Sequence, residues 1–263
     1  MKRSLDGFIL FYKKTLKMRK PVSITNNIDT RYLKWPELIP GTLIKRYKRF
    51  LADIILENGQ EITAHCANTG SMTECSQPGR PVYVSYHDNP QRKYKYSWEL
   101  IHMPSSLVGV NTAMPNKLVQ HSIRQKLIQP FLGYEYLKAE KKLDSGSRLD
   151  IFLWNHEKDV CYIEVKNCTL VTDGVASFPD AVTTRGQKHL HELQQLRDEN
   201  TRCAMFFLIQ RSDADVFRPA DKIDPAYGEA LRKAVKNGVE IIVYDVDINL
   251  NGIRINKEIP YLL

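Results

Sequence analysis

The sequence predicts an α/β protein (α+β overall), in which a small β-barrel precedes a domain with a mixed central sheet flanked by helices. From Gly41 to about Val110, short apolar runs alternate with turn residues, a pattern typical of barrel strands. From about Asn116 the apolar period changes to that of an amphipathic helix, and strands then alternate with helices. A chain of 263 residues accommodates two such domains.

The first half contains a strong hairpin signal. Asn58-Gly59 separates the apolar run Phe50–Leu56 from Glu61–His65, and Asn-Gly between two such runs favours a tight turn. Turn residues also flank Pro81–Tyr86 and the aromatic-rich segment Tyr94–Leu100. About five strands in about 70 residues fit a small barrel, which we place at residues 39–115.

The second half, residues 116–263, has the predicted order α-β-β-β-α-β followed by one more helix and strand. Val119, Ile123 and Leu127 recur every fourth residue and predict the first helix. Thr183 or Thr184 can cap the second helix, and Gly238 ends the third. The later elements are predicted at Tyr134–Leu143, Arg148–Trp154, Val160–Val165, Cys203–Gln210, Pro225–Asn237 and Val239–Tyr244.

The charge is unevenly distributed. Lys and Arg number 38 against 30 Asp and Glu, a net charge of +8. Residues 1–38 hold nine basic and three acidic residues, whereas residues 119–263 hold twenty and twenty-one. We therefore expect residues 1–38 to be a basic, poorly ordered extension. The excess invites a nucleic-acid interpretation, but blocks of charge are more often solvated surface, so motifs must decide.

Compartment and partners follow from cysteine usage and hydropathy. The five cysteines, at positions 66, 75, 161, 168 and 203, contain no Cys-x-x-Cys pair, which predicts a reducing cytoplasm and no disulfide partner. No apolar run approaches the roughly 18 residues needed to span a bilayer, so no membrane partner is expected. The protein could form a homodimer.

The most informative pattern is Asp150 followed by Glu164-x-Lys166. Glu164 and Lys166 are two residues apart on a predicted strand, so both side chains leave the same face. Asp150, on the preceding strand, can lie opposite them. Two carboxylates can hold Mg²⁺, and the ammonium can orient water or stabilise developing phosphate charge. The alternative is a surface ion pair without function.

Many segments together resemble one family, the bacterial and archaeal sugar fermentation stimulation protein A family. The resemblance runs from about residue 40 to 248 and leaves residues 1–38 outside. The segments that carry it are Leu43–Phe50, Thr63–Met72, Asp88–Pro90, Gly109–Ala113, Cys161–Leu170, Phe178–Ala181, Thr184–Leu190 and Gln210–Asp213.

The resemblance implies an N-terminal OB-like β-barrel and a C-terminal domain of the PD-(D/E)xK nuclease type. It also implies nonspecific DNA binding and, more loosely, a role in regulating sugar use, particularly maltose. The nuclease motif falls on Asp150, Glu164 and Lys166, all of the required residue types. The implied cofactor is Mg²⁺, with Mn²⁺ as a substitute.

Other candidates each have a plain structural alternative. Asp180 can be a further metal ligand or a helix cap, and Asn68–Ser71 can be an anion-binding loop or a turn. Basic residues interleaved with aromatics can contact nucleic acid, or the aromatics can be core and the charges their wet side. The nucleic-acid candidates are Lys45, Arg46, Tyr47, Lys48, Arg49, Arg92, Lys93, Lys95, Arg185, Lys188 and His189.

The residue patterns and the resemblance together predict a cytoplasmic DNA-binding protein with nonspecific, phosphate-dominated binding and a regulatory role in sugar metabolism. The alternative is an active Mg²⁺-dependent DNA endonuclease that uses Asp150, Glu164 and Lys166. A third class, a sugar-metabolism regulator acting through a protein or small-molecule partner, predicts little affinity for DNA.

Overall fold

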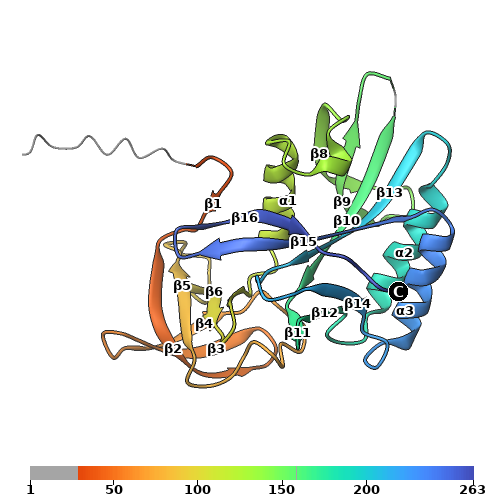
Figure 1. Ribbon diagram of the computed structural model, residues 1–263. Coiled ribbons are helices and arrows are strands. Elements are labelled where there is room, and N and C mark those ends of the chain that lie inside the picture. The colour runs from red at the N-terminus through yellow and green to blue at the C-terminus, as the bar shows by residue number, and fades with distance from the viewer. Residues whose placement is uncertain (1–28, 158) are drawn as a thin grey trace, which may run out of the picture. The chain divides into compact units, whose positions relative to one another are not determined.

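The computed structural model describes residues 29–157 and 159–263 (Figure 1), within which Arg31–Leu263 forms one compact unit. Most of the predicted basic extension, residues 1–28, lies outside the described residues. The part of the predicted extension that the structure describes, residues 29–38, is not poorly ordered, because β1 (Leu33–Lys34) pairs with a strand of the C-terminal sheet. The buried Trp35 explains this, since its indole N–H donates to the carbonyl of Asn249 at 2.8 Å.

The first domain is a closed barrel, as predicted. Its strands follow the order β4-β3-β2-β5-β6-β7, and β4 also pairs with β6, which closes the barrel. Gly59 (φ +81°) makes the tight turn between β3 and β4. Leu43, Ile54 and Trp98 are among its buried core residues. The strands are β2 (Leu38–Tyr47), β3 (Leu51–Leu56), β4 (Glu61–His65), β5 (Pro81–Tyr86), β6 (Tyr96–His102) and β7 (Leu107–Gly109).

The second domain is built on a mixed seven-stranded sheet, again as predicted. The strand order is β1-β16-β15-β13-β10-β9-β8. The central strands β10, β13 and β15 run parallel, and the outer pairings are antiparallel. The strands after β1 are β8 (Tyr136–Lys142), β9 (Arg148–Trp154), β10 (Val160–Cys168), β13 (Thr201–Ile209), β15 (Glu240–Asn249) and β16 (Gly252–Glu258).

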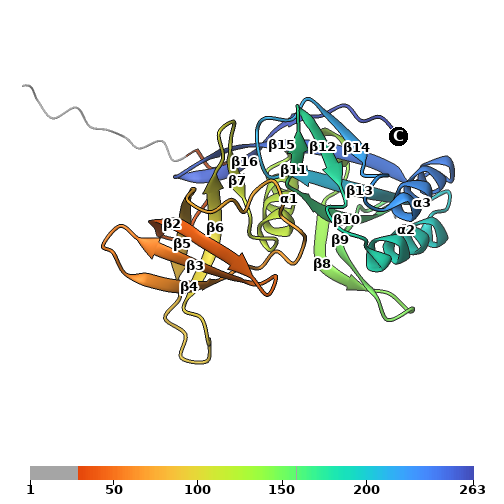
Figure 2. The same ribbon diagram turned by 90° about the horizontal axis from the view of Figure 1, so that it is seen from below.

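Helices cover the sheet unequally (Figures 1 and 2). The helix α1 (Met114–Arg124) packs on β8, β9, β10 and β16, whereas α2 (Thr184–Leu196) packs on β13 and against α3 (Pro225–Lys236). Leu127 was predicted on the first helix but lies beyond its end. The chain turns there because Lys126 has φ +56° and the N–H of Leu127 donates to Ser122. A short 3₁₀ helix, η1 (Gln129–Phe131), precedes β8.

A small second sheet was not predicted. It consists of β11 (Leu170–Thr172), β12 (Val175–Phe178) and β14 (Val216–Pro219), in the order β11-β12-β14. Two of these strands lie in sequence between β10 and α2. They therefore fix where the chain enters the loop at residues 179–183, just before α2.

Two further observations concern partners. In the part of the chain that the structure describes, no helix is long and apolar enough to cross a membrane. All five cysteines are buried free thiols.

Candidate active site

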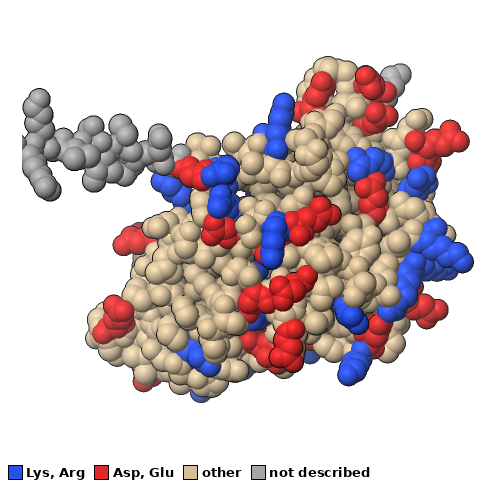
Figure 3. Space-filling model, viewed as in Figure 1, with Lys and Arg blue, Asp and Glu red and all other residues tan. Residues whose placement is uncertain are grey.

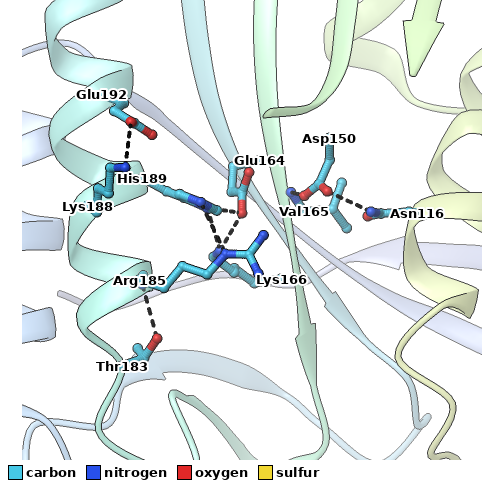
Figure 4. A network of polar contacts seen from close by, with 11 residues as sticks. Asn116, Asp150, Glu164, Val165, Lys166, Thr183, Arg185, Lys188, His189 and Glu192 are labelled. Carbon is cyan, nitrogen blue, oxygen red and sulfur yellow. Dashed lines mark hydrogen bonds and ion pairs between the residues drawn. The ribbon is translucent and has the colours of Figure 1, made fainter. Parts of the chain in front are cut away.

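Glu164 is the centre of the candidate site. It lies in the middle of β10, where Glu164 and Lys166 point to the same face, as their spacing predicted. The side chain is nearly inaccessible, with 3% of the residue exposed. Its Oε1 lies 2.5 Å from Lys166 Nζ and also contacts His189 Nδ1. Figure 4 shows Lys166, His189 and Arg185 gathered around this carboxylate.

His189 reaches Glu164 from α2 and is itself only 4% exposed. Its two nitrogens have different partners. Nδ1 contacts Glu164, and Nε2 lies 3.5 Å from Arg185 Nε, which can only donate. This favours the tautomer in which Nδ1–H donates to the carboxylate and Nε2 accepts from Arg185. His189 and Arg185 were predicted to contact nucleic acid; the structure instead places His189 inside the site and Arg185 next to it.

The placement of α2 depends on its N-terminus. Thr183 Oγ1 accepts the N–H of Gly186 at 3.0 Å, so Thr183 is the N-cap. The N–H of Thr183 donates in turn to Asp224 Oδ2 at 2.8 Å. Asp224 caps α3 as well, and it accepts from Gln187 at 3.3 Å. One buried carboxylate thus holds both helices in the positions that bring His189 to Glu164.

Asp150 completes the set. Its carboxylate accepts the backbone N–H of Val165 at 2.8 Å and the amide of Asn116 at 2.7 Å. Burial, followed by the charge of Glu164, raises the pKa of Asp150 to about 6. The two carboxylates therefore interact, as predicted for residues on neighbouring strands. Asn116 was missed as a site residue, because nothing in a helix N-terminus signals a partner 34 positions away.

The carboxylates differ in how their charge is compensated. Burial acts to raise the pKa of Glu164, but Lys166 and then His189 outweigh it and hold the pKa below its usual range. The other carboxylate oxygen, Oε2, is buried without a hydrogen-bond partner among the described residues. An unpartnered anionic oxygen beside a second, half-buried carboxylate is the arrangement that a cation would satisfy.

The residues present fit a hard cation with few protein ligands. Within residues 29–157 and 159–263, no group of three or more His, Cys, Asp or Glu side chains is placed to hold a metal. Asp150 and Glu164 alone would leave most ligand positions to water or substrate oxygens, which is how Mg²⁺ is commonly bound.

Asp180, the third predicted ligand, lies on the loop before α2 and interacts with the barrel. Its Oδ2 accepts the N–H of Met72 at 3.2 Å. It lies so close to Gly70 that a side chain there would collide with it. The structure thus gives Asp180 a role in joining the two domains.

Arg46 is a structural residue of the barrel. Its guanidinium donates to the carbonyls of Asn68, Gly70 and Ser71 at 2.8–3.0 Å and to that of Arg49 at 2.7 Å. The predicted anion-binding loop at residues 68–71 therefore turns carbonyls towards Arg46 rather than N–H groups towards a ligand. This argues against both predictions, because both terminal nitrogens of the guanidinium donate to backbone oxygens, while its Nε is buried without a hydrogen-bond partner among the described residues.

The other basic candidates are distributed over the surface. Lys45 pairs with Asp53 at 3.7 Å, and the Tyr47 hydroxyl donates to the same Asp53. Lys48 and Arg49 are exposed in the turn between β2 and β3. Lys188 pairs with Glu192 at 3.7 Å.

The second barrel group is partly engaged in local contacts. Arg92 donates to Ser97 at 2.8 Å, Lys95 donates to the carbonyl of Asn89 at 2.7 Å, and Lys93 lies 5.5 Å from the ring centre of Tyr94. On the face seen in Figure 3, basic and acidic side chains are interspersed over most of the surface, and basic side chains gather only at the right edge, where Figure 1 shows α2 and α3.

Together, the closed barrel and the mixed sheet with its helices define an OB-type domain joined to an α/β domain that carries the Asp-Glu-Lys cluster. Comparison with known proteins agrees. The family model described as "SfsA N-terminal OB domain" matches residues 44–110, and "Sugar fermentation stimulation protein RE domain" matches residues 113–252. The chain belongs to the sugar fermentation stimulation protein family.

The chain aligns with its relatives over nearly the full length of each relative. A "Sugar fermentation stimulation protein homolog" from Geotalea uraniireducens is 47% identical over 84% of this chain and 96% of its own. One from Shewanella frigidimarina is 48% identical over 87% and 98%. The solved "structure of Pyrococcus Furiosus SfsA in complex with Ca2+" superposes with a TM-score of 0.81 at 25% identity, covering 89% of this chain and 99% of that one.

The first prediction tests the structural role of Arg46. Arg46→Ala leaves four backbone carbonyls without their donor, so we expect it to lower the free energy of unfolding by about 2–3 kcal/mol. Lys45→Ala, one residue earlier and exposed, should change it by less than about 1 kcal/mol. Urea unfolding of both variants measures the difference; equal stabilities would contradict the assignment.

The second prediction concerns Asp150. Its pKa is raised to about 6 in the folded state, so folding favours the protonated acid. Ionised Asp150 therefore lowers the free energy of unfolding above pH 6, and this loss disappears as the pH falls towards about 4, the ordinary pKa of an aspartic acid. Asp150→Asn should therefore stabilise the metal-free protein by about 1–2 kcal/mol at pH 7.5 and by much less at pH 4.5.

Thermal unfolding in EDTA at both pH values tests this, with Asp213→Asn as the control of opposite sign. Burial acts to raise the pKa of Asp213, but its bonds to Arg211 and Ser105 hold that pKa below its usual range. Asp213→Asn should then destabilise the protein at pH 7.5. A loss of stability in Asp150→Asn at pH 7.5 would show that the ionised Asp150 does not lower the free energy of unfolding.

Proposed function

We propose that this protein binds DNA and hydrolyses its phosphodiester bonds in a reaction that depends on Mg²⁺. One observation carries the proposal: the half-buried Asp150 lies next to the buried Glu164, whose Oε2 has no partner among the described residues and whose Oε1 is bound by the ammonium of Lys166. The relative solved in complex with Ca²⁺ supports a divalent cation in this family. Glu192 and Asp245 also have a buried carboxylate oxygen without a partner among the described residues, so what distinguishes Glu164 is the second carboxylate and the ammonium next to it.

Asp150 and Glu164 are the residues that would hold Mg²⁺, or Mn²⁺ in its place. A bound divalent ion supplies a Lewis acid for the phosphate and lowers the pKa of a water that can attack it. The protein's contribution is to hold two carboxylates in a region from which water is largely excluded.

Lys166 and His189 have separate roles in this proposal. The ammonium of Lys166 is the cation nearest to the carboxylate, and it can stabilise the charge that develops on a phosphate oxygen. His189 does not need to touch substrate. Held by Arg185, it fixes which way the Glu164 carboxylate points, as partners of metal-binding side chains commonly do.

Phosphate contacts from the barrel are assigned to its exposed basic residues, Lys45, Lys48 and Arg49. Arg49 and the loop Phe178–Thr183 line a cleft of about 300 Å³ between the two domains. A backbone held by lysines and arginines of this kind would be bound with little regard to sequence.

The family name links these proteins to sugar fermentation, and a regulatory role in sugar use would operate through this DNA binding. A cytoplasmic location and a homodimer remain predictions.

The third prediction is metal-dependent cleavage. Labelled plasmid and linear duplex should be cut in Mg²⁺ or Mn²⁺ and not in EDTA. Glu164→Gln and Lys166→Met should each lower the rate by at least about a hundredfold. Lys236→Met, an exposed lysine at the end of α3, is the matched control and should cut at the normal rate.

A thermal shift with Mg²⁺ separates metal binding from cleavage. The cation should raise the unfolding temperature of the unaltered protein and not that of Glu164→Gln, because a ligand of the folded state stabilises it. Intact DNA together with a Mg²⁺-dependent shift would leave a DNA-binding protein with a metal site and no nuclease activity. Cleavage that persists in both variants would rule out this site.

The fourth prediction concerns nonspecific binding. The slope of log affinity against log salt reports the phosphates neutralised, at roughly 0.9 per contact on duplex. Lys48→Ala/Arg49→Ala should reduce that slope by about 2 and weaken binding equally on unrelated sequences. Fluorescence anisotropy over a salt series measures both. An unchanged slope would place the phosphate contacts elsewhere.

A further inference from the structure

A row of aromatic side chains crosses the sheet next to the candidate site. Tyr136 on β8 stacks on Trp154 of β9 with ring centres 5.2 Å apart, and Trp154 stacks on Phe152 at 5.4 Å. Phe152 meets Tyr162 of β10 at 4.8 Å. We call Tyr136, Trp154, Phe152 and Tyr162 the aromatic row. It spans three neighbouring strands.

The row lies on the same sheet face as Glu164 and Lys166. Tyr162, Glu164 and Lys166 alternate along β10, so all three side chains leave the same face. Two residues along a strand amount to about 7 Å. The row therefore ends one side-chain position from the candidate metal-binding carboxylate.

The described helices leave most of this stretch of the sheet uncovered, and α2 comes near the row only at Tyr162, which packs against the cluster that contains Leu190 and Leu193. The helix α1 packs on β8, β9 and β10 through the apolar residues of the other face, among them Ile151, Leu153 and Ile163. The helix α2 packs on β13, farther along the sheet (Figures 1 and 2). Tyr136 is consequently 38% exposed, and the other three rings are partly exposed. An aromatic row that served only as core would be covered.

The surroundings of the row are suited to an anionic ligand. Lys141 Nζ lies 4.9 Å from the ring centre of Phe152. Lys138, which is exposed, is the residue of β8 that pairs with Phe152 of β9. Tyr162, Lys141 and Lys142 also line a groove of about 330 Å³ between the β8–β9 hairpin and α2, together with the acidic Asp144 and Glu192. Stacking surfaces flanked by lysines are the means by which proteins hold unpaired bases while contacting their phosphates.

We propose that the aromatic row is a stacking platform for unpaired nucleotides, so that the preferred substrate carries a single-stranded segment next to the bond that is cut. The proposal rests on the proposed function for the reaction but not for the binding. In a duplex the bases are stacked on each other and their faces are unavailable to protein rings. A platform of this kind therefore discriminates for single strands, ends and tails.

Tryptophan fluorescence gives a direct test in EDTA, where no cleavage occurs. The chain has three tryptophans; Trp98 is fully buried and Trp35 is 9% exposed, so Trp154 is the accessible one. An oligothymidylate should quench the emission of the unaltered protein. Trp154→Phe should lose the quenching while retaining oligothymidylate affinity within about threefold, because a ring is still present.

Leucine variants remove the ring faces and keep apolar volume. Tyr136→Leu/Phe152→Leu should weaken oligothymidylate binding at least about fivefold in anisotropy and leave blunt duplex binding unchanged. Tyr261→Leu is the matched control, since Tyr261 is 40% exposed against 38% for Tyr136 and lies at the chain end. Circular dichroism confirms that each variant is folded; if the double variant does not fold, Tyr136→Leu alone decides by the same two affinities.

The outcomes separate this proposal from the proposed function. Quenching that is lost in Trp154→Phe, with no cleavage under any condition, would support the platform and overturn the nuclease. Cleavage of blunt duplex without quenching, and with unchanged affinity in the leucine variants, would overturn the platform alone. Quenching by a neutral glucose oligosaccharide and not by oligothymidylate would overturn it in favour of a sugar ligand.

Discussion

The burial of the Glu164 carboxylate is the constraint on which the rest of the site depends. An ion removed from water must be surrounded by partners, and those of Glu164 come from two elements. Lys166 lies on the same strand as Glu164, whereas His189 lies on α2, which starts eighteen residues after Lys166 in the chain. Holding that helix requires the Thr183 cap and Asp224. The contacts that hold α2 and α3 in place are thus also the contacts that supply the buried Glu164 carboxylate with its His189 partner.

Much of the fold could be predicted because its main elements carry strong local signals. Arg148–Trp154 is a mostly apolar run that follows the turn at Ser145-Gly146, and it has the predicted bounds. The cap at Thr183 and Gly238 with φ +87° also follow sequence rules. The three short strands of the second sheet have no such signal, since three or four residues are too few to show a period. The pairing of β1 with β16 joins distant parts of the chain, and no local pattern encodes it.

The candidate site divides in the same way. The two-residue spacing of Glu164 and Lys166 fixes their common face, so this pair could be predicted from the sequence. The direction of His189 depends on how α2 rotates on the sheet, which the sequence leaves open. Arg46 was misjudged because its partners are backbone carbonyls. Carbonyl direction follows from loop conformation and leaves no trace in residue type.

The unequal covering of the central sheet links fold to function. The helix α1 shields one face of β8, β9 and β10, and α2 shields the other face only as far as is needed to bring His189 to Glu164. If α2 reached farther across the sheet, it would bury Phe152 and Trp154 and close the approach to the carboxylates. The cost of the present arrangement is exposed aromatic surface, which water tolerates poorly. A ligand with flat faces would cover the exposed rings, and its negative charge would pair with the nearby lysines. A nucleotide strand has both properties.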